Sequence, residues 1–153
     1  MTDRAVRVAI NGFGRIGRSF LRVALQRQST VDIVAVNDTN DPAMLGYLLE
    51  YDTVHRQLAD APKLIDGHLQ VGRFDMKLSA EADPEHLPWA ALDIDVVVES
   101  TGRFTMAPEA ARHVEAGARR VVISAPATGA DVTICIGVNH ERFDPARHVV
   151  VSN

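Results

Sequence analysis

A strand pattern and a helix pattern follow one another at the start of the chain. Val6 to Ile10 is an apolar run rich in β-branched residues, and it meets a cluster of glycines. The apolar positions after these glycines recur at the spacing of one helix face: Ile16, Phe20, Val23 and Ala24. Val31 to Val36 is a second apolar run of strand length. Residues 6–36 therefore predict a strand, a helix and a strand, in a unit of about the usual 30 residues.

Three more helical stretches follow along the chain. Asp41-Pro42 opens a segment in which proline is tolerated in the first turn and leucines recur at helical spacing. Asp83-Pro84 predicts the start of a short helix that runs through Leu92. Residues 108–115 are rich in alanine, and Gly117 is placed to end that helix in the left-handed conformation.

The remaining apolar runs predict strands at residues 94–98, 121–123, 132–138 and 149–151. Residues 63–80 differ, because Asp66-Gly67 lies between short apolar stretches, and they predict a small antiparallel insertion. Strands that alternate with helices in units of this length favour an α/β fold with an open, mostly parallel, doubly wound sheet. No repeat or linker divides the chain, so we expect a single domain over residues 1–153.

Composition and charge exclude several classes of function. The chain has 153 residues, of which 46% are apolar and 24% charged, as in ordinary soluble domains. Its formal charge is −4 and its basic residues are scattered, which argues against a nucleic acid or an anionic membrane as partner. The sequence shows no apolar run of membrane-spanning length and one cysteine, which favours a cytoplasmic protein.

The glycine cluster after the first strand has the spacing of a dinucleotide-binding motif. Gly12, Gly14 and Gly17 form GxGxxG between a predicted strand and a predicted amphipathic helix. In a Rossmann-type fold the first glycine permits a tight turn, the second lets the backbone approach a pyrophosphate, and the third lets the helix pack closely on the strand. The alternative is that these glycines serve only a tight turn between strand and helix.

Asp38 lies at the end of the second predicted strand, beyond the glycine motif. An acidic side chain at this place can accept hydrogen bonds from the ribose diol of the cofactor and repels a 2′-phosphate. Asp38 therefore favours NAD over NADP. The alternative is a helix cap or turn residue before Asp41-Pro42.

Short strings along nearly the whole chain resemble glyceraldehyde-3-phosphate dehydrogenase, in order and in spacing. They are INGFGRIGR at 10–18, VND at 36–38, DPAMLGYLLEYDTVH at 41–55, LPW at 87–89, ESTGRFT at 99–105, ISAP at 123–126, IGVNH at 136–140 and VVSN at 150–153. The resemblance implies a domain that binds NAD, in an enzyme that oxidatively phosphorylates glyceraldehyde 3-phosphate and passes a hydride to NAD. It also implies a homo-oligomer, which is a tetramer in that family.

The resemblance implies a set of cofactor-binding residues. Arg15 and Ile16 match positions whose backbone meets the pyrophosphate, and Ile16 also lies near the nicotinamide. Asn37 lies near the adenosine or caps the strand end, and Ser124 matches a residue beside the nicotinamide. The full set comprises Gly12, Gly14, Arg15, Ile16, Gly17, Asn37, Asp38, Thr101, Gly102, Phe104 and Ser124.

Two positions depart from the family. Ala82 stands where many relatives have an arginine that frames the adenine pocket, so that side-chain contact is lost while a backbone contact is kept. Arg103 stands where relatives commonly have a small or apolar residue, and we expect its side chain to be solvated.

The resemblance also implies that the catalytic residues lie outside this chain. In relatives VVSN runs into Ala-Ser-Cys-Thr-Thr-Asn, whose cysteine is the nucleophile, whereas the given sequence ends at Asn153. We therefore expect no catalytic residue here, an absent catalytic domain, and binding of the phosphorylated triose only if the downstream half is present. Cys135 lies in an apolar run, where we expect a buried strand cysteine that acts as a small hydrophobe.

Other functions remain open at this point. The six histidines form no ligand set of known spacing, so we expect no metal site. Erythrose-4-phosphate dehydrogenase is an alternative enzyme, although that subgroup tends to have Glu at the position of Asp38. A stand-alone, non-catalytic dinucleotide-binding module and an oligomerisation fragment are the alternatives from other classes.

Overall fold

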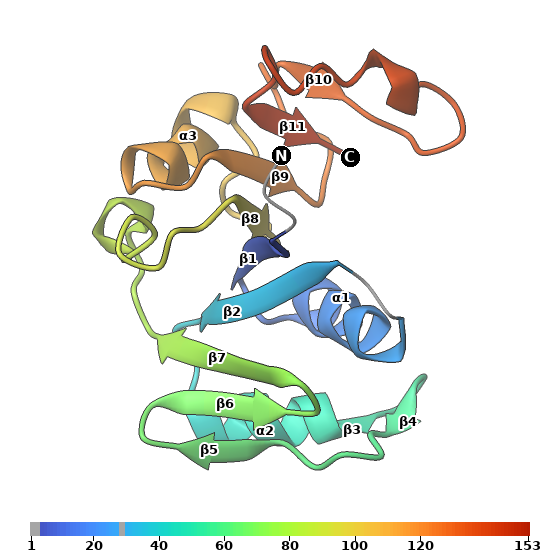
Figure 1. Cartoon of the computed structure of the whole chain (residues 1–153), viewed down its shortest axis with the longest axis vertical. Helices are drawn as coiled ribbons and strands as arrows, with labels where there is room; N and C mark the ends of the chain where they lie inside the picture. The colour runs from blue at the N-terminus through green and yellow to red at the C-terminus, as the bar shows by residue number, and fades with distance from the viewer. Residues whose placement is uncertain (1–3, 28–29) are drawn as a thin grey trace.

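One large twisted sheet forms the centre of the protein (Figure 1). The computed structural model describes residues 4–27 and 30–153. Within these residues the strand order is β10-β11-β9-β8-β1-β2-β7-β6-β5, and all pairs from β10 to β7 are parallel. The strands are β1 (Val6–Asn11), β2 (Val31–Asn37), β5 (Lys63–Ile65), β6 (His68–Val71), β7 (Phe74–Ser79), β8 (Val96–Glu99), β9 (Arg120–Ile123), β10 (Val132–Thr133) and β11 (Val150–Ser152).

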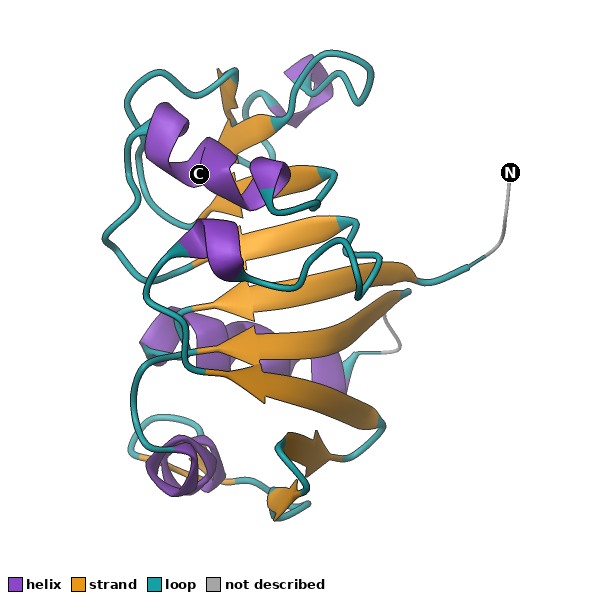
Figure 2. Cartoon of the chain, turned by 90° about the vertical axis from the view of Figure 1, so that its left-hand side faces the viewer, coloured by secondary structure: helices purple, strands orange, loops and turns teal. Residues whose placement is uncertain are grey.

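Helices cover both faces of this sheet. The helices are α1 (Arg15–Gln26), α2 (Pro42–Glu50) and α3 (Ala107–Glu115), with 3₁₀ turns η1 (Pro84–His86) and η2 (His140–Arg142). In Figure 2, α3 and η1 lie in front of the sheet and α1 lies behind it. A short hairpin of β3 (Tyr51–Asp52) and β4 (Arg56–Gln57) follows α2. This arrangement confirms the predicted doubly wound α/β fold.

The alternation of side chains along the strands builds two hydrophobic cores. Ile10 packs with Leu21 of α1 and Leu49 of α2 on one face, whereas the adjacent Ala9 packs on the other face with Trp89 and Val97. Successive residues of a strand point to opposite faces, so a parallel sheet covered on both sides needs apolar residues at every position. The near-continuous apolar runs of the sequence follow from this demand.

The antiparallel strands of residues 63–80 belong to the main sheet rather than to a separate unit. β5 and β6 pair antiparallel across a turn in which Asp66 has φ of 49° and Gly67 has φ of 78°. Two successive residues with positive φ give the type of turn that matches the twist of a hairpin. β7 then pairs parallel with β2, and so joins the hairpin to the edge of the parallel sheet.

Two predicted elements are shorter than expected. The helix predicted from Asp83 to Leu92 is only the single turn η1. Pro88 disfavours the helical conformation of the residue before it, and Leu87 accordingly has ψ of 140°. The strand predicted over 132–138 ends at Thr133, because the side chain of Asn139 bonds to the backbone of residues 133 and 135 and folds the chain into a loop.

The prediction of the buried face of helix α1 is only partly right, because Ala24 is buried but two of the other predicted residues are exposed. Its buried apolar row is Gly17, Leu21 and Ala24, whereas the predicted face residues Ile16 and Val23 are 54% and 45% exposed. One residue turns a helix by about 100°, so these two side chains lie a third of a turn away from the sheet. The close packing of Gly17 on the turn before the helix fixes this orientation.

Arg22 is buried on α1, although it carries a charge. Only 4% of the residue is exposed, and its guanidinium donates hydrogen bonds to the carbonyl oxygens of Leu49, Glu50 and Arg56. The last carbonyls of a helix have no partner within the helix and carry partial negative charge. Arg22 therefore caps the carboxyl end of α2 and ties the hairpin β3–β4 to α1. No helix among the described residues is long and apolar enough to span a membrane.

Candidate dinucleotide-binding site

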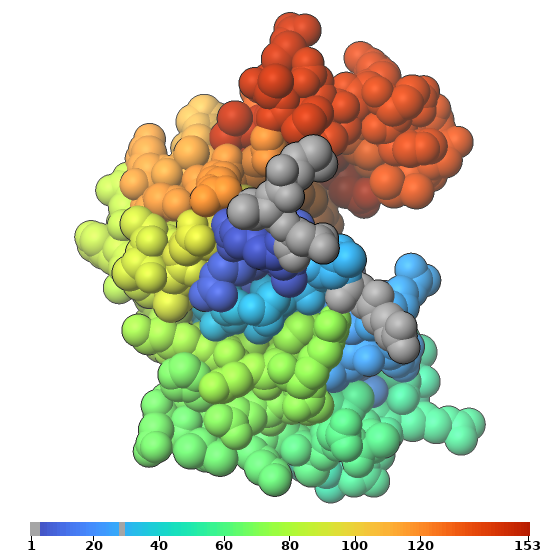
Figure 3. Space-filling model, in the orientation of Figure 1, coloured from blue at the N-terminus to red at the C-terminus, as the bar shows by residue number. Residues whose placement is uncertain are grey.

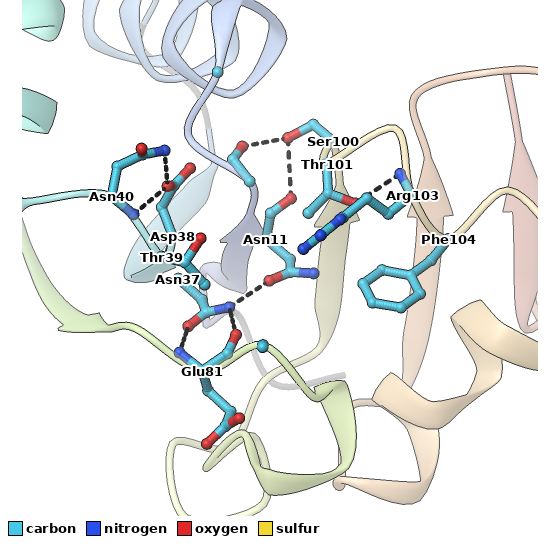
Figure 4. A pocket seen from close by; sticks show the side chains of 13 residues that line it. Asn11, Asn37, Asp38, Thr39, Asn40, Glu81, Ser100, Thr101, Arg103 and Phe104 are labelled. Atoms are coloured by element: carbon cyan, nitrogen blue, oxygen red, sulfur yellow. Dashed lines mark hydrogen bonds between the residues drawn. The ribbon is translucent and has the colours of Figure 1, made fainter.

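A polar pocket opens at the carboxyl edge of the sheet (Figure 4). It has a volume of about 280 Å³ and lies where β1, β2 and β8 end. In open α/β sheets this edge is where ligands bind, outside the carboxyl ends of the strands. The lining residues are Asn11, Gly12, Gly14, Asn37, Asp38, Thr39, Asn40, Glu81, Ala82, Ser100, Thr101, Arg103 and Phe104.

A larger hollow of about 880 Å³ lies elsewhere, against β8, β9 and β11. It is bordered by the segment of residues 132–149, which projects from the body of the molecule in Figure 3. Valine and isoleucine side chains line much of it, among them Val96, Val122 and Ile134. A dinucleotide needs hydrogen-bond partners and a positive field for its phosphates, so the smaller polar pocket is the candidate site.

The three motif glycines each meet a different steric demand. Gly12 has φ of +89°, and a Cβ there would lie 2.6 Å from the backbone nitrogen of Thr101. A Cβ at Gly17 would overlap the carbonyl oxygen of Gly12. A Cβ at Gly14 would meet nothing within 4 Å, so neither the turn nor the packing explains this glycine. A tight turn between strand and helix therefore explains the glycines at positions 12 and 17, but it does not explain the glycine at position 14.

Gly14 is the N-cap residue of α1 and lines the pocket. No side chain caps this helix end, and its first turn contains no acidic residue. The first N–H groups of a helix lack partners within the helix, and the helix dipole gives them partial positive charge. This end of α1 therefore suits a phosphate group, for which a glycine leaves the approach open.

Asp38 holds two parts of the pocket together. Its Oδ2 accepts a hydrogen bond of 2.7 Å from the backbone N–H of Phe13, and its Oδ1 accepts from the backbone and side-chain nitrogens of Asn40. Two carboxylate oxygens offer about four acceptor positions, so one position stays open toward a ligand. The alternative for Asp38 was a turn residue or a helix cap. Its bonds to Asn40 make it a turn residue as well, whereas the residue that caps α2 is Asp41.

Asparagines at the ends of β1 and β2 form the floor of the pocket. Asn37 donates from Nδ2 to Oδ1 of Asn11 over 2.7 Å and to the carbonyl oxygen of Glu81 over 2.8 Å. Its Oδ1 accepts from the backbone N–H of Glu81 at 2.8 Å. Both donor positions and one of the two acceptor positions of the Asn37 amide are thus used within the protein, and the side chain ties together the ends of three neighbouring strands.

Comparison with known proteins agrees with this geometry. Residues 6–107 match the family model described as glyceraldehyde 3-phosphate dehydrogenase, NAD binding domain. The chain belongs to this family. It is 51% identical over 149 residues to the glyceraldehyde-3-phosphate dehydrogenase of Kitasatospora aureofaciens and 51% identical over 150 residues to that of Geobacillus stearothermophilus. These alignments cover 96% and 97% of the chain but 44% of each relative, so the chain spans less than half of their length.

NAD is therefore the cofactor of this domain, and the pocket fits it. The uncapped end of α1 at Gly14 suits the pyrophosphate, and the open acceptor position of Asp38 suits a ribose hydroxyl. Phe104 offers an aromatic ring in the pocket wall, on which a base can stack. When bound, NAD supplies a nicotinamide ring that accepts a hydride.

The pocket brings together six of the eleven sequence-predicted site residues. Those that line it are Gly12, Gly14, Asn37, Asp38, Thr101 and Phe104. Arg15 and Ile16 are exposed at the start of α1, just beyond Gly14, and Gly17 is buried under the turn. Gly102 lies with φ of 72° in the same loop as Thr101. Ser124 follows β9, where its N–H donates to the carbonyl oxygen of Glu99 at 2.9 Å.

Several lining residues were missed by reasoning from the sequence. They are Asn11, Thr39, Asn40, Glu81 and Ser100. Most follow the carboxyl end of a parallel strand or stand as its last residue, so a search of all strand ends would have found them. The departures Ala82 and Arg103 both line the pocket as well, and Figure 4 shows the Arg103 side chain pointing into it. The exposure of Arg103 agrees with the predicted solvation.

The expectation for Cys135 was wrong. The residue is exposed and lies beyond β10 in the loop that Asn139 holds, because the backbone N–H of Cys135 donates to Oδ1 of Asn139 at 2.7 Å. It does not line the nucleotide pocket. In the described parts of the chain, no three His, Cys, Asp or Glu side chains gather closely enough to hold a metal ion.

Proposed function

We propose that this chain supplies the NAD-binding portion of a dehydrogenase that oxidatively phosphorylates glyceraldehyde 3-phosphate. The observation that carries this proposal is the uncapped N-terminus of α1, which opens at Gly14 into a pocket that also holds Asp38. A phosphate-binding helix end beside an acidic ribose ligand is the arrangement that a nicotinamide dinucleotide requires. The names of the relatives support the triose as substrate.

The eleven residues predicted from the sequence are proposed to contact or support NAD in two ways. Those that line the pocket meet the cofactor, with Asp38 on the adenosine ribose and Phe104 beside the adenine. Arg15, Ile16 and Ser124 lie outside this pocket. We assign the backbone of Arg15 and Ile16 to the pyrophosphate, and Ile16 and Ser124 to the nicotinamide end of an extended cofactor. Asp38, rather than Glu, is also the reason to favour this substrate over erythrose 4-phosphate.

The Asp38→Ala variant is expected to bind NAD more weakly by about 1.5–3 kcal/mol, because a charge-assisted hydrogen bond to the ribose is lost. Its preference for NAD over NADP should also shrink, since no carboxylate then repels the 2′-phosphate. Isothermal titration of both cofactors measures the two effects. Equal affinity of the unmodified protein for NAD and NADP would contradict the role of Asp38.

Asp41→Ala is the matched control for this experiment. Asp41 lies three residues further along and accepts hydrogen bonds from the N–H groups of Ala43 and Met44 at the start of α2. Loss of such a cap typically lowers stability by about 1 kcal/mol. We expect this variant to bind NAD as the unmodified protein does, which separates binding from folding.

The chemical step is proposed to need a nucleophile from outside residues 1–153. A covalent route through a thiohemiacetal requires a thiolate beside the substrate. Cys135 is the one cysteine of the sequence, and it lies in an exposed loop away from the pocket. We therefore propose that binding of the phosphorylated triose and its chemistry depend on a further part of the enzyme.

The purified 153-residue chain is expected to form no NADH from glyceraldehyde 3-phosphate and inorganic phosphate, even though it binds NAD. An absorbance assay of NADH tests this. The positive control is a longer version of the protein, extended beyond Asn153 by a region that corresponds to the remaining part of the relatives. Turnover by the short chain that is lost in Cys135→Ser would make Cys135 the nucleophile and would overturn the proposal.

We also propose that the protein acts in the cytoplasm as a homo-oligomer. Met44, Tyr47, Tyr51 and Val54 are exposed apolar side chains on and beside α2, and Val54 is 78% exposed. Adjacent exposed apolar side chains of this kind commonly mark protein contacts. Light scattering of the longer protein measures its oligomeric state.

A further inference from the structure

A second group of polar residues lies buried behind the floor of the pocket. Glu99 ends β8 and is 2% exposed, and His113 on α3 is fully buried. Trp89, which follows η1, is fully buried beside His113. Neither the family description nor the cofactor assigns a role to these three side chains. A buried carboxyl group such as that of Glu99 is costly unless it has hydrogen-bond partners.

The carboxylate of Glu99 receives four hydrogen bonds. Oε1 accepts from the backbone N–H of Thr101 at 2.8 Å and from the hydroxyl of Thr101. Oε2 accepts from Nδ2 of Asn11 at 2.6 Å and from Nε2 of His113 at 2.8 Å. Two carboxylate oxygens offer about four acceptor positions, so these four contacts leave no acceptor position of Glu99 open.

Trp89 fixes the tautomer of His113. The indole Nε1–H of Trp89 lies 3.0 Å from Nδ1 of His113, and an indole N–H can only donate. Nδ1 is therefore the acceptor, and the proton of the neutral imidazole is on Nε2, where it is donated to Glu99. Nδ2 of Asn11 and Nε2 of His113 lie 3.3 Å apart because both donate to the same oxygen, Oε2 of Glu99. With this tautomer they do not bond to each other.

This buried group reaches the pocket by two routes. Glu99 holds Thr101 and Asn11, both of which line the pocket, and Asn11 in turn accepts a hydrogen bond from Asn37. The ring of Phe104, another lining residue, meets the ring of His113 edge to face with 6.4 Å between centroids. His113 thus contacts the pocket walls from behind without lining the pocket itself.

We propose that His113 is a positioning residue for NAD. Its neutral ring, oriented by Trp89, donates from Nε2 to Glu99, and Glu99 then holds the Thr101 backbone and the Asn11 amide in the geometry that receives the nucleotide. The inference rests on the proposed NAD site. Without this donor the buried carboxylate loses one of four partners, the loop at Thr101 loosens, and the cofactor has to order it on binding.

Two substitutions of His113 each remove one of its two hydrogen bonds and keep the other. His113→Gln places an Nε2 donor near that of histidine and keeps the bond to Glu99, while it gives up the acceptor for Trp89. His113→Asn places Oδ1 near the original Nδ1 and keeps the bond from Trp89, while it gives up the donor to Glu99. A purely structural role predicts similar losses from both variants.

We expect NAD to bind about ten-fold more weakly to His113→Asn and within about two-fold of the unmodified affinity to His113→Gln. Hydrogen exchange at the Thr101 amide should be faster in His113→Asn and unchanged in His113→Gln. Fluorescence of Trp89, the one tryptophan of the sequence, should change only in His113→Gln. This last signal reports whether each variant keeps the intended hydrogen bond.

The outcomes separate the inference from the function on which it rests. Unmodified protein that does not bind NAD would contradict the proposed function. Unmodified protein that binds NAD, together with equal affinities of the two variants, would overturn the positioning role. If a His113 variant does not fold, Trp89→Phe replaces it: we expect about three-fold weaker NAD binding and faster exchange at Thr101, and no change in either would likewise overturn the role.

Discussion

The Gly12→Ala variant is expected to lose about 3 kcal/mol or more of its free energy of unfolding, and NAD binding with it. Gly12 adopts a φ of +89°, which strains an L-residue, and its new Cβ would lie 2.6 Å from the nitrogen of Thr101 and 2.8 Å from the carbonyl carbon of Ser100. These are backbone atoms of the neighbouring segment, so no flexible side chain can move aside. Urea unfolding measures the loss.

Gly14→Ala is the control that separates stability from binding. Gly14 has φ of −73°, which alanine adopts freely, and its Cβ would meet nothing within 4 Å. We expect the free energy of unfolding to stay within about 1 kcal/mol of the unmodified value. NAD affinity should nevertheless fall, because the methyl group projects into the space where phosphates approach the helix end. Unchanged NAD affinity of this variant would contradict the placement of the pyrophosphate.

The Arg22→Ala variant is expected to lose about 3 kcal/mol of stability. Its guanidinium donates to the carbonyl oxygens of Leu49, Glu50 and Arg56. When the side chain is removed, the buried bond to Leu49 is lost, whereas the carbonyl oxygen of Glu50 keeps the N–H of Leu58. Truncation also opens a space between α1 and the end of α2. Chemical denaturation measures the effect, and increased proteolysis in the hairpin of residues 51–57 should accompany it.

Arg27→Ala is the matched control for Arg22. Arg27 follows the end of the same helix and is exposed, so its truncation is expected to change stability by less than about 0.5 kcal/mol. An equal loss in both variants would show that general charge, rather than the cap on α2, explains the effect. NAD affinity of folded Arg22→Ala should stay near that of the unmodified protein, since Arg22 does not line the pocket.

The glycine motif and Asp38 were predictable because local sequence determines them. A strand, a tight turn and a helix N-terminus are set by neighbouring residues, so GxGxxG in its context predicts both the backbone path and the ligand. Asp38 follows the next strand of the same unit. The parallel pairing of β1 and β2 then brings the two close enough for Asp38 to bond the N–H of Phe13.

Other features depend on contacts that periodicity does not record. Ile16 and Val23 match the apolar spacing of a helix face, yet the tight packing of Gly17 turns them toward solvent. The strand at Val132 ends early because a side chain four residues beyond Cys135 folds the loop back. Glu99 and His113 give no sign of burial in the sequence, since their pairing requires α3 to lie on the ends of β1 and β8.

The floor of the pocket has a consequence for how the protein is made. Asn11 and Glu99 are bonded to each other although 88 residues separate them, and the strands that they end are direct neighbours in the sheet. Contacts across such long loops form slowly compared with local ones. The unit of residues 6–37 can therefore assemble early on the ribosome, whereas the bond between Asn11 and Glu99 waits until β8 has emerged. NAD consequently finds no complete site before β8 has paired with β1, and its binding marks a chain in which this pairing has formed.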